Sequence, residues 1–119
     1  MSTKNLWIKK QERKIYKMEN LLELGFKVNT LGFKYWIKAI EIYKKDGWRY
    51  GFTMQYLYEE IANYYETTKI RVERALRTCS DTAKDNLQMK YQYSGKITNK
   101  VILDLLTFDY YFRNIREEK

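Results

Sequence analysis

The sequence predicts an all-α fold of five to six helices built around a helix-turn-helix. Three observations lead to this prediction. The 119 residues include no proline and only 5 glycines, which favours helices joined by short connections. Apolar residues recur every three or four positions along most of the chain, as on the buried side of a helix. Two of the expected helices are separated by only a few residues, which is the spacing of a helix-turn-helix.

The composition indicates one folded domain with a surplus of positive charge. Hydrophobic residues make up 45% of the chain, which is enough for a single core. We therefore expect one helical domain over residues 1–119, with residues 1–17 as a basic N-terminal extension of the first helix. The 23 lysines and arginines exceed the 15 acidic residues, so the net charge is +8. Such a surplus attracts polyanions, but charge alone does not identify nucleic acid as the ligand.

The sequence carries no signal for export or membrane insertion. Its first residues lack the apolar centre of a signal peptide, and no apolar stretch approaches the roughly 20 residues that span a bilayer. The single cysteine, Cys79, has no partner for an internal disulfide and is expected to be a small buried side chain. We expect a soluble, cytoplasmic protein that does not contact membranes.

The first two expected helices each end at a glycine. The first covers residues 5–24, and Gly25 lies where a left-handed C-cap is expected. The second covers residues 31–46, with Gly47 as its stop. The apolar side is formed in the first helix by Leu6, Ile8, Ile15, Met18, Leu21 and Leu22, and in the second by Phe33, Trp36, Ile37, Ile40 and Tyr43.

Threonines mark the starts of the next two helices. Thr53 is the expected N-cap of a third helix, which carries Leu57, Ile61, Tyr64 and Tyr65. A fourth helix is expected to begin at Thr67 or Thr68. Its apolar residues have the spacing i, i+3, i+4 and i+7 of a buried row: Val72, Ala75, Leu76 and Cys79.

The C-terminal third of the chain has a weaker pattern followed by a clear helix. Residues 85–96 lose the apolar periodicity and predict a loop or a short irregular helix. Thr98 is the expected cap of the last helix. Its apolar side consists of Val101, Ile102, Leu105, Leu106, Phe108 and Phe112.

The third and fourth helices together form the expected helix-turn-helix. Positions that such a unit keeps apolar or small hold Ile61, Ala62, Tyr65, Val72 and Ala75. Ala62 matters most, because the two helices cross closely there and a larger side chain would push them apart. Glu66 occupies the turn position that often carries glycine, which weakens the match slightly.

The fourth helix presents cationic and hydroxyl side chains opposite its apolar row, so that residues 68–79 are expected to form a recognition helix. Arg71, Arg74 and Thr78 lie at i, i+3 and i+7, with Lys69 and Arg77 on the flanks. Guanidinium groups on one helix face can donate two hydrogen bonds to a guanine edge in the major groove, or pair with phosphate. A solvated basic face is the alternative. The adjoining helix and turn favour DNA binding.

Two further sets of residues leave alternatives open. Glu73 either accepts a hydrogen bond from cytosine N4 or orients Arg77 at i+4. Tyrosines at helical spacing either stack on bases or pack with the hydroxyl at the surface, and we expect packing because duplex readers seldom need a stacking platform. The tyrosines concerned are Tyr56, Tyr58, Tyr64, Tyr65, Tyr110 and Tyr111.

Catalysis has little to build on in this sequence. The chain contains no histidine and none of the Cys-x-x-Cys, phosphate-loop, dinucleotide or Gly-x-Ser-x-Gly motifs. We expect neither an enzyme, nor a metal site, nor a cofactor.

The stretch LYEEIANYYETTKIRVERALRTCSDTA resembles the recognition region of a known family, the C-terminal DNA-binding effector domain of the response regulator stage zero sporulation protein A. LLELGFKVNTLGFKYWIKAI is similar to the first two helices of that domain, and KITNKVILDLL to its closing helix. The resemblance covers roughly residues 18–112. It implies a six-helix effector domain of the sporulation type that binds short promoter boxes in double-stranded DNA, with protomers able to occupy tandem sites.

Position by position, the resemblance assigns the recognition-helix roles to Arg71, Glu73, Arg74 and Arg77, and the turn to Thr67 and Thr68. Two residues depart from the family's pattern. Ile70 stands in place of a serine, and Thr78 in place of a histidine. These departures are expected to remove a phosphate or base contact and to change the preferred box.

The expected function is therefore that of a transcriptional regulator, with the DNA contacts on Thr67, Thr68, Lys69, Arg71, Glu73, Arg74, Arg77 and Thr78. Double-stranded DNA is the expected partner, with a homodimer on tandem sites and RNA polymerase as further candidates. The alternatives are a protein-interaction module that has lost specific DNA affinity, and a nonspecific nucleic-acid binder. The sequence shows no phosphoacceptor domain before the effector region, so control by phosphorylation is not expected in the usual form.

Overall fold

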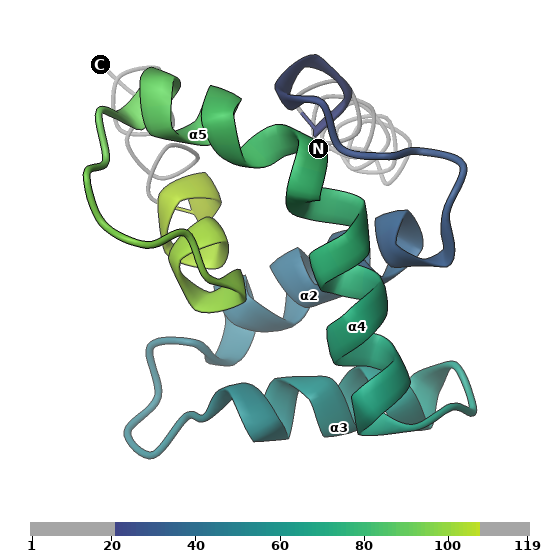
Figure 1. The fold of residues 1–119 in the computed structure, drawn as a ribbon. Coiled ribbons are helices and arrows are strands. Elements are labelled where there is room, and N and C mark those ends of the chain that lie inside the picture. The colour runs from purple at the N-terminus through teal and green to yellow at the C-terminus, as the bar shows by residue number, and fades with distance from the viewer. Residues whose placement is uncertain (1–20, 108–119) are drawn as a thin grey trace, which may run out of the picture.

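The computed structural model describes residues 21–107, and these residues form helices joined by turns and loops, without a strand. Figure 1 shows the order of the elements. The labelled elements are α2 (Leu31–Asp46), α3 (Met54–Tyr64), α4 (Lys69–Ser80), a 3-10 turn (Asp81–Ala83) and α5 (Lys84–Tyr91), and helical residues also occur at 21–24 and 99–107. The predicted all-α fold is confirmed. Residues 1–17, Phe108, Tyr110, Tyr111 and Phe112 lie outside the described residues.

The predicted glycine at the end of the first helix has the expected conformation. Gly25 has φ +94°, the left-handed region that a residue with a side chain rarely adopts. Gly47 also follows the predicted end of α2, but its φ is −62°, so it does not form a left-handed cap. The left-handed conformation occurs later, at Gly51, where φ is +84° and where a residue with a side chain would be strained.

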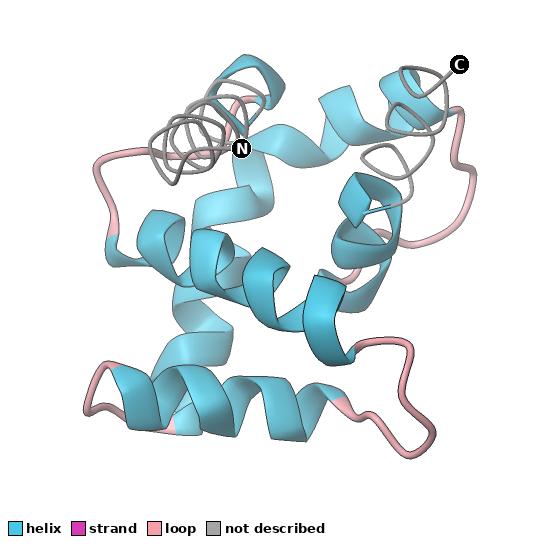
Figure 2. Ribbon diagram, turned by 180° about the vertical axis from the view of Figure 1, so that it is seen from behind, coloured by secondary structure: helices cyan, strands magenta, loops and turns pink. Residues whose placement is uncertain are grey.

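The core lies where α4 crosses α2 and α3. In Figure 1, α4 runs from the level of α3 up to α5, and Figure 2 shows α2 and α3 from the other side, in front of α4. Trp36 of α2 is fully buried, and its indole Nε1 donates a hydrogen bond of 2.8 Å to the carbonyl oxygen of Leu76 in α4. A buried indole N–H needs such a partner. This bond therefore fixes α4 against α2.

Gly32 allows the backbones of α2 and α4 to approach each other. A Cβ atom at this position would lie 2.1 Å from the carbonyl oxygen of Ala75, which is far below a van der Waals distance. Gly32 was not predicted as a contact residue, because a glycine inside a helix shows its role only when the neighbouring helix is known.

The region after α4 differs from the sequence-based expectation. Residues 84–91 form a regular helix, α5, where a loop or short irregular helix was expected. The apolar periodicity is weak because Leu87 is the one buried residue of α5. Thr98 caps the last helix as predicted, since its Oγ1 accepts from the N–H of Val101 at 3.3 Å. Within that helix Ile102 and Leu106 are buried as expected.

Leu103, also fully buried, was not predicted, because it falls outside the expected apolar stripe.

The tyrosines divide into two groups. Tyr58 is buried and Tyr65 is half-buried, as expected for packing residues. Tyr56 is 38% exposed and Tyr64 is 63% exposed, so the packing prediction is wrong for Tyr64, whose ring lies largely in solvent.

Candidate nucleic-acid interface

The turn between α3 and α4 is held by backbone and threonine hydrogen bonds. The N–H of Thr67 donates to the carbonyl oxygen of Ala62 at 2.9 Å, which closes the end of α3. Thr68 Oγ1 accepts from the N–H of Arg71 at 3.3 Å, so Thr68 is the N-cap and α4 begins at Lys69. The observed helix, Lys69–Ser80, is displaced by one residue at each end from the predicted 68–79.

The backbone conformation at Glu66 shows why glycine is common at this turn position. Its φ is +55°, in the left-handed region, where a residue with a Cβ costs about 1 kcal/mol or more. Ala62 is 4% exposed at the place where α3 and α4 meet, as expected for a small residue at a helix crossing. The sequence-based helix-turn-helix is thus present, with an unfavourable residue in its turn.

One side of α4 is buried against the rest of the domain. Val72, Leu76 and Cys79 are fully buried, whereas Ala75 is only half-buried, so the prediction of a buried Ala75 is wrong. Ala75 lies at the edge of the stripe, where Gly32 contacts its backbone rather than its side chain. Cys79 Sγ donates a hydrogen bond of 3.3 Å to the carbonyl oxygen of Lys27. Burial raises the pKa of this thiol above its usual value, so the thiolate is disfavoured.

The other side of α4 is exposed and basic. The structure brings together on it most of the predicted DNA contacts, all of them exposed: Lys69, Arg71, Arg74, Arg77 and Thr78. Thr68 is also exposed at the start of the helix, while Thr67 is half-buried in the turn. A helix with one side in the core and cationic donors on the other has the geometry required to enter a DNA groove.

Glu73 is half-buried at the edge of this exposed side and pairs with Arg77. Arg77 Nη2 lies 2.9 Å from Glu73 Oε1, and the two residues are separated by one helical turn. The pairing predicted from the i, i+4 spacing is therefore formed. It gives the guanidinium of Arg77 a preferred direction before any ligand binds.

Ile70 also lies on the exposed side, although the predicted contacts did not include it. Its side chain is 64% exposed. The spacing i, i+4 and i+7 places Ile70, Arg74 and Arg77 in one row along α4. The sequence-based interpretation treated Ile70 only as a replacement of the family's serine that removes a contact, although this spacing already placed it beside Arg74.

A groove with a cavity volume of about 390 Å³ continues the basic surface beyond α4. Its lining has four cationic residues, one carboxylate and three residues with hydroxyl or amide groups: Arg77, Lys84, Lys96 and Lys100, Glu73, and Tyr58, Thr98 and Asn99. Asn99 Nδ2 donates to the hydroxyl of Tyr58 at 3.2 Å, which ties the start of the last helix to α3 beside the groove. Lys96 and Lys100 were not predicted because they are distant from α4 along the chain, and Lys84 was not predicted because it lies beyond the end of α4, after the 3-10 turn.

Two of these lysines already have carboxylate neighbours. Lys84 Nζ is 3.2 Å from Asp81 Oδ1, and Lys100 Nζ is 3.2 Å from Asp104 Oδ2. Both pairs are exposed, and exposed ion pairs contribute little free energy, so a phosphate can compete for either lysine. The groove therefore remains available to an anionic strand.

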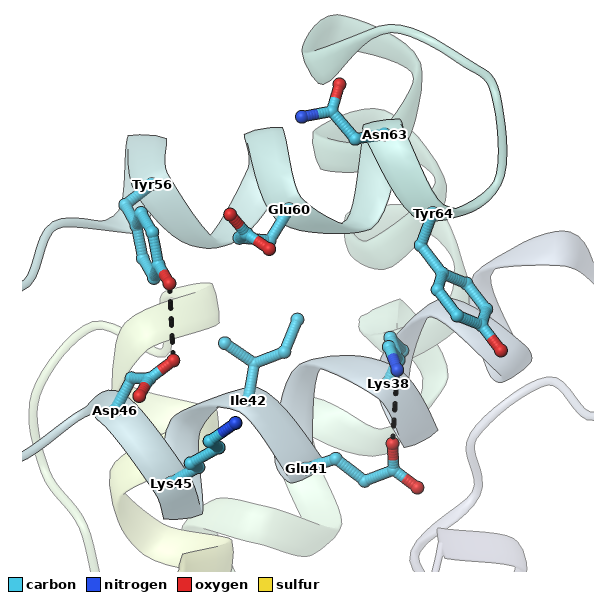
Figure 3. Close-up of a pocket in the computed structure, with 9 residues that line it drawn as sticks. All are labelled: Lys38, Glu41, Ile42, Lys45, Asp46, Tyr56, Glu60, Asn63 and Tyr64. Carbon is cyan, nitrogen blue, oxygen red and sulfur yellow. Dashed lines mark hydrogen bonds and ion pairs between the residues drawn. The ribbon is translucent and has the colours of Figure 1, made fainter.

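A second groove, of about 630 Å³, lies between α2 and α3 and has a different charge (Figure 3). Its ionisable lining consists of three carboxylates and two lysines: Glu41, Asp46, Glu60, Lys38 and Lys45. Tyr56 and Tyr64 lie at the two ends of the α3 wall, with Ile42 below them. The residues of α3 that line it, Tyr56 and Glu60 among them, lie on the side of α3 opposite to Tyr58. The excess of carboxylates makes this groove a poor surface for nucleic acid.

Three of its five charged side chains, Lys38, Glu41 and Asp46, have close polar or aromatic partners. Lys38 Nζ lies 3.6 Å from Glu41 Oε2 and 4.0 Å from the ring centroid of Tyr64. The hydroxyl of Tyr56 donates to Asp46 Oδ2 at 3.3 Å, and Arg49 Nε lies 3.4 Å from Asp46 Oδ1. The groove thus contains local ion pairs and a cation–π contact. Its lining does not form a row of cationic side chains like the one on α4.

Within residues 21–107, no three histidine, cysteine, aspartate or glutamate side chains are placed to hold a metal ion. None of the helices in this part of the chain combines the length and apolar character that a membrane crossing requires.

Comparison with known proteins identifies the family. A search of curated proteins finds no significant match. The family model described as the C-terminal domain of sporulation initiation factor Spo0A matches residues 17–106, which is most of the chain. This family consists of DNA-binding effector domains and is not a family of enzymes. The chain therefore belongs to the Spo0A C-terminal family and has the all-helical fold and DNA-binding character of that family.

Proposed function

We propose that this protein is a sequence-specific transcriptional regulator that inserts α4 into the major groove of double-stranded DNA. The observation that carries the proposal is the exposed row of cationic side chains on α4, within a helix-turn-helix whose opposite side is buried. A recognition helix contacts base edges mainly through its N-terminal residues. Lys69, Arg71 and Arg74 occupy the first half of α4.

Arg71 and Arg74 have the chemistry for reading guanine. A guanidinium can donate to both N7 and O6 of one guanine, and each such pair contributes about 1 to 3 kcal/mol of discrimination against the wrong base. Arg77, held by Glu73, is proposed to contact the phosphate backbone or a base further along the groove. Thr78 has a hydroxyl that can donate to either kind of acceptor.

The turn and the flanking groove are proposed to bind phosphates. The hydroxyl of Thr68 accepts the capping bond, and its proton remains free to donate to a phosphate oxygen. Thr67 lies beside it in the turn. Lys96 and Lys100 would neutralise the strand that borders the major groove next to Arg77. Phosphate contacts of this kind position the protein without reading sequence.

A second candidate function is a protein-interaction module. The groove between α2 and α3 and the exposed rings of Tyr64 and Trp48, 63% and 77% exposed, favour contact with another protein, such as a second protomer on a tandem site or RNA polymerase. Exposed aromatic residues are enriched at protein interfaces. This function is compatible with DNA binding, because the basic side of α4 and the α2–α3 groove share no residue. A regulator acting on chromosomal DNA would work in the cytoplasm.

Selection of bound duplexes from a random library tests the proposal directly. We expect one short motif to be enriched, and we expect the protein to bind it at least about tenfold more tightly than a scrambled duplex at moderate salt. Enrichment should disappear for Arg74→Ala. The control is Lys45→Ala in the second groove, which should select the same motif as the native chain. Equal affinity for all duplexes would support nonspecific binding, and no binding would support the interaction module.

A further inference from the structure

Ile70 is an exposed apolar side chain in the middle of a cationic surface. It is 64% exposed and lies in the first turn of α4, in one row with Arg74 and Arg77. The large side chains buried in α4 are Val72 and Leu76, on the opposite side of the helix. The fold therefore does not use Ile70 as a core residue.

The helix itself does not favour isoleucine at this place. Isoleucine is β-branched and loses rotamer freedom in a helix, so lysine, glutamate or alanine would stabilise an exposed helical position better. Single exposed apolar residues are common and need no special explanation. Ile70 differs from them in its position, because its neighbours on the row, Arg74 and Arg77, are the proposed DNA contacts.

We propose that Ile70 reads a thymine in the binding site through contact with its 5-methyl group. This inference rests on the proposed function, since it requires α4 to lie in the major groove. The 5-methyl of thymine is the apolar group that base edges present there. Burying both surfaces removes apolar area from water, which is the favourable term that Ile70 lacks in the free protein.

The row also predicts where this thymine lies. Ile70 and Arg74 are four residues apart, which is about 6 Å along the helix axis. Base pairs are separated by about 3.4 Å along the duplex. For a helix lying along the groove, the thymine contacted by Ile70 is expected within about two base-pair steps of the base contacted by Arg74.

Replacement of thymine by deoxyuridine tests the contact, because it removes only the methyl group. Each thymine of the selected motif is replaced singly, and affinities are measured for the native chain and for Ile70→Ala. For the native chain, one position should lose about fourfold in affinity, since burial of one methyl-sized group contributes about 0.8 kcal/mol and about 1.4 kcal/mol corresponds to tenfold. For Ile70→Ala, the same replacement should have no effect.

Two further variants separate this contact from a general effect on the domain. Ile70→Val retains two branched methyl groups and should retain part of the sensitivity to deoxyuridine. Met89→Ala removes a side chain that is 79% exposed on α5, away from the row, and should leave the sensitivity unchanged. Ile70 is exposed, so its replacement should not lower the thermal midpoint.

Each outcome of this experiment is informative. The inference is supported if Ile70→Ala loses the deoxyuridine effect while Met89→Ala keeps it. The ratio of affinities for the selected motif and the scrambled duplex should still depend on Arg74. An unchanged deoxyuridine effect in Ile70→Ala, or none in the native chain, overturns it while specific binding stands. If the native chain does not distinguish the motif from a scrambled duplex, the proposed function itself fails.

Discussion

The two sides of α4 differ in burial and in charge. On one side Val72, Leu76 and Cys79 have no exposed surface and contact α2 and α3. On the other side Arg71 and Arg74 lie in solvent. Hydrophobic burial stabilises the first side, whereas the second contributes little to folding because exposed charges interact weakly in water. One helix of 12 residues therefore carries its core contacts and its proposed DNA contacts on separate side chains.

This separation has a practical meaning for mutagenesis. A replacement on the buried side should change the free energy of unfolding, and a replacement on the exposed side should change only the affinity for DNA. Five predictions test this separation and the surface beside α4.

The largest effect is expected for Leu76→Ala. Leu76 is fully buried, and truncation leaves a cavity that costs about 2 to 5 kcal/mol of unfolding free energy. Urea unfolding followed by circular dichroism measures the change. Arg74→Ala is the matched control and should unfold at the same urea concentration as the native chain. A loss below about 1 kcal/mol for Leu76→Ala would show that α4 is not anchored as described.

Arg74→Ala should weaken binding to the selected motif by about 1 to 3 kcal/mol, because Arg74 lies at the middle of the exposed row. Affinity for a scrambled duplex should change much less, since nonspecific binding depends on phosphates. Fluorescence anisotropy with both duplexes measures the ratio. An equal loss on the two duplexes would mean that Arg74 contacts phosphate rather than a base.

The double variant Lys96→Gln with Lys100→Gln should weaken both duplexes by a similar factor and leave their ratio unchanged. Each lysine that neutralises a phosphate contributes about 0.9 to the slope of log affinity against log salt, so the slope should fall by about 2. Lys45→Gln, in the groove between α2 and α3, removes one positive charge on another surface and should leave the slope nearly unchanged. Unequal losses on the two duplexes would place one of the two lysines at a base edge.

The smallest effect is expected for the buried thiol, and it appears only at high pH. Because the pKa of Cys79 is raised in the folded protein, stability is fully present below the ordinary value of 9.0 and declines as the pH rises above it. Tyr58, whose pKa is raised mainly by burial, adds to the decline above 10.0. Urea midpoints measured across this range should fall, and Cys79→Ala should remove the part that begins near 9.0.

Labelling of Cys79 gives an independent check on the same side of α4. The thiol is fully buried, so a thiol reagent should react with the native protein at neutral pH only when the domain opens. Rapid reaction of the native chain would contradict the burial of this side.

Features of the fold that depend on residues close together in sequence were predicted correctly, and features that depend on distant residues were not. The limits of α2 and the caps at Thr53, Thr68 and Thr98 were predicted because capping depends on residues close in sequence. The apolar periodicity of α5 is weak because only Leu87 of this helix is buried, and one buried residue cannot define an apolar stripe.

The site divides in the same way. The exposed row on α4 was predicted, since its members share one helix and a fixed spacing. Lys84 and Lys96 were not predicted as part of the surface, because only the folded chain brings them beside Arg77. Ile70 was predicted only as a departure from the family's serine that removes a contact, and its exposure became clear from the packing of Val72 and Leu76.

The close approach of α2 and α4 at Gly32 also determines how the domain meets its ligand. Since the two backbones touch and Trp36 bonds to Leu76, α4 is preorganised before DNA arrives. Little conformational entropy is then lost from the protein when it binds, so a larger share of the contact free energy is retained as affinity. Under the proposed function, a mismatch in groove width would be accommodated by bending of the duplex, and the flexibility of the DNA sequence would become a second determinant of site preference.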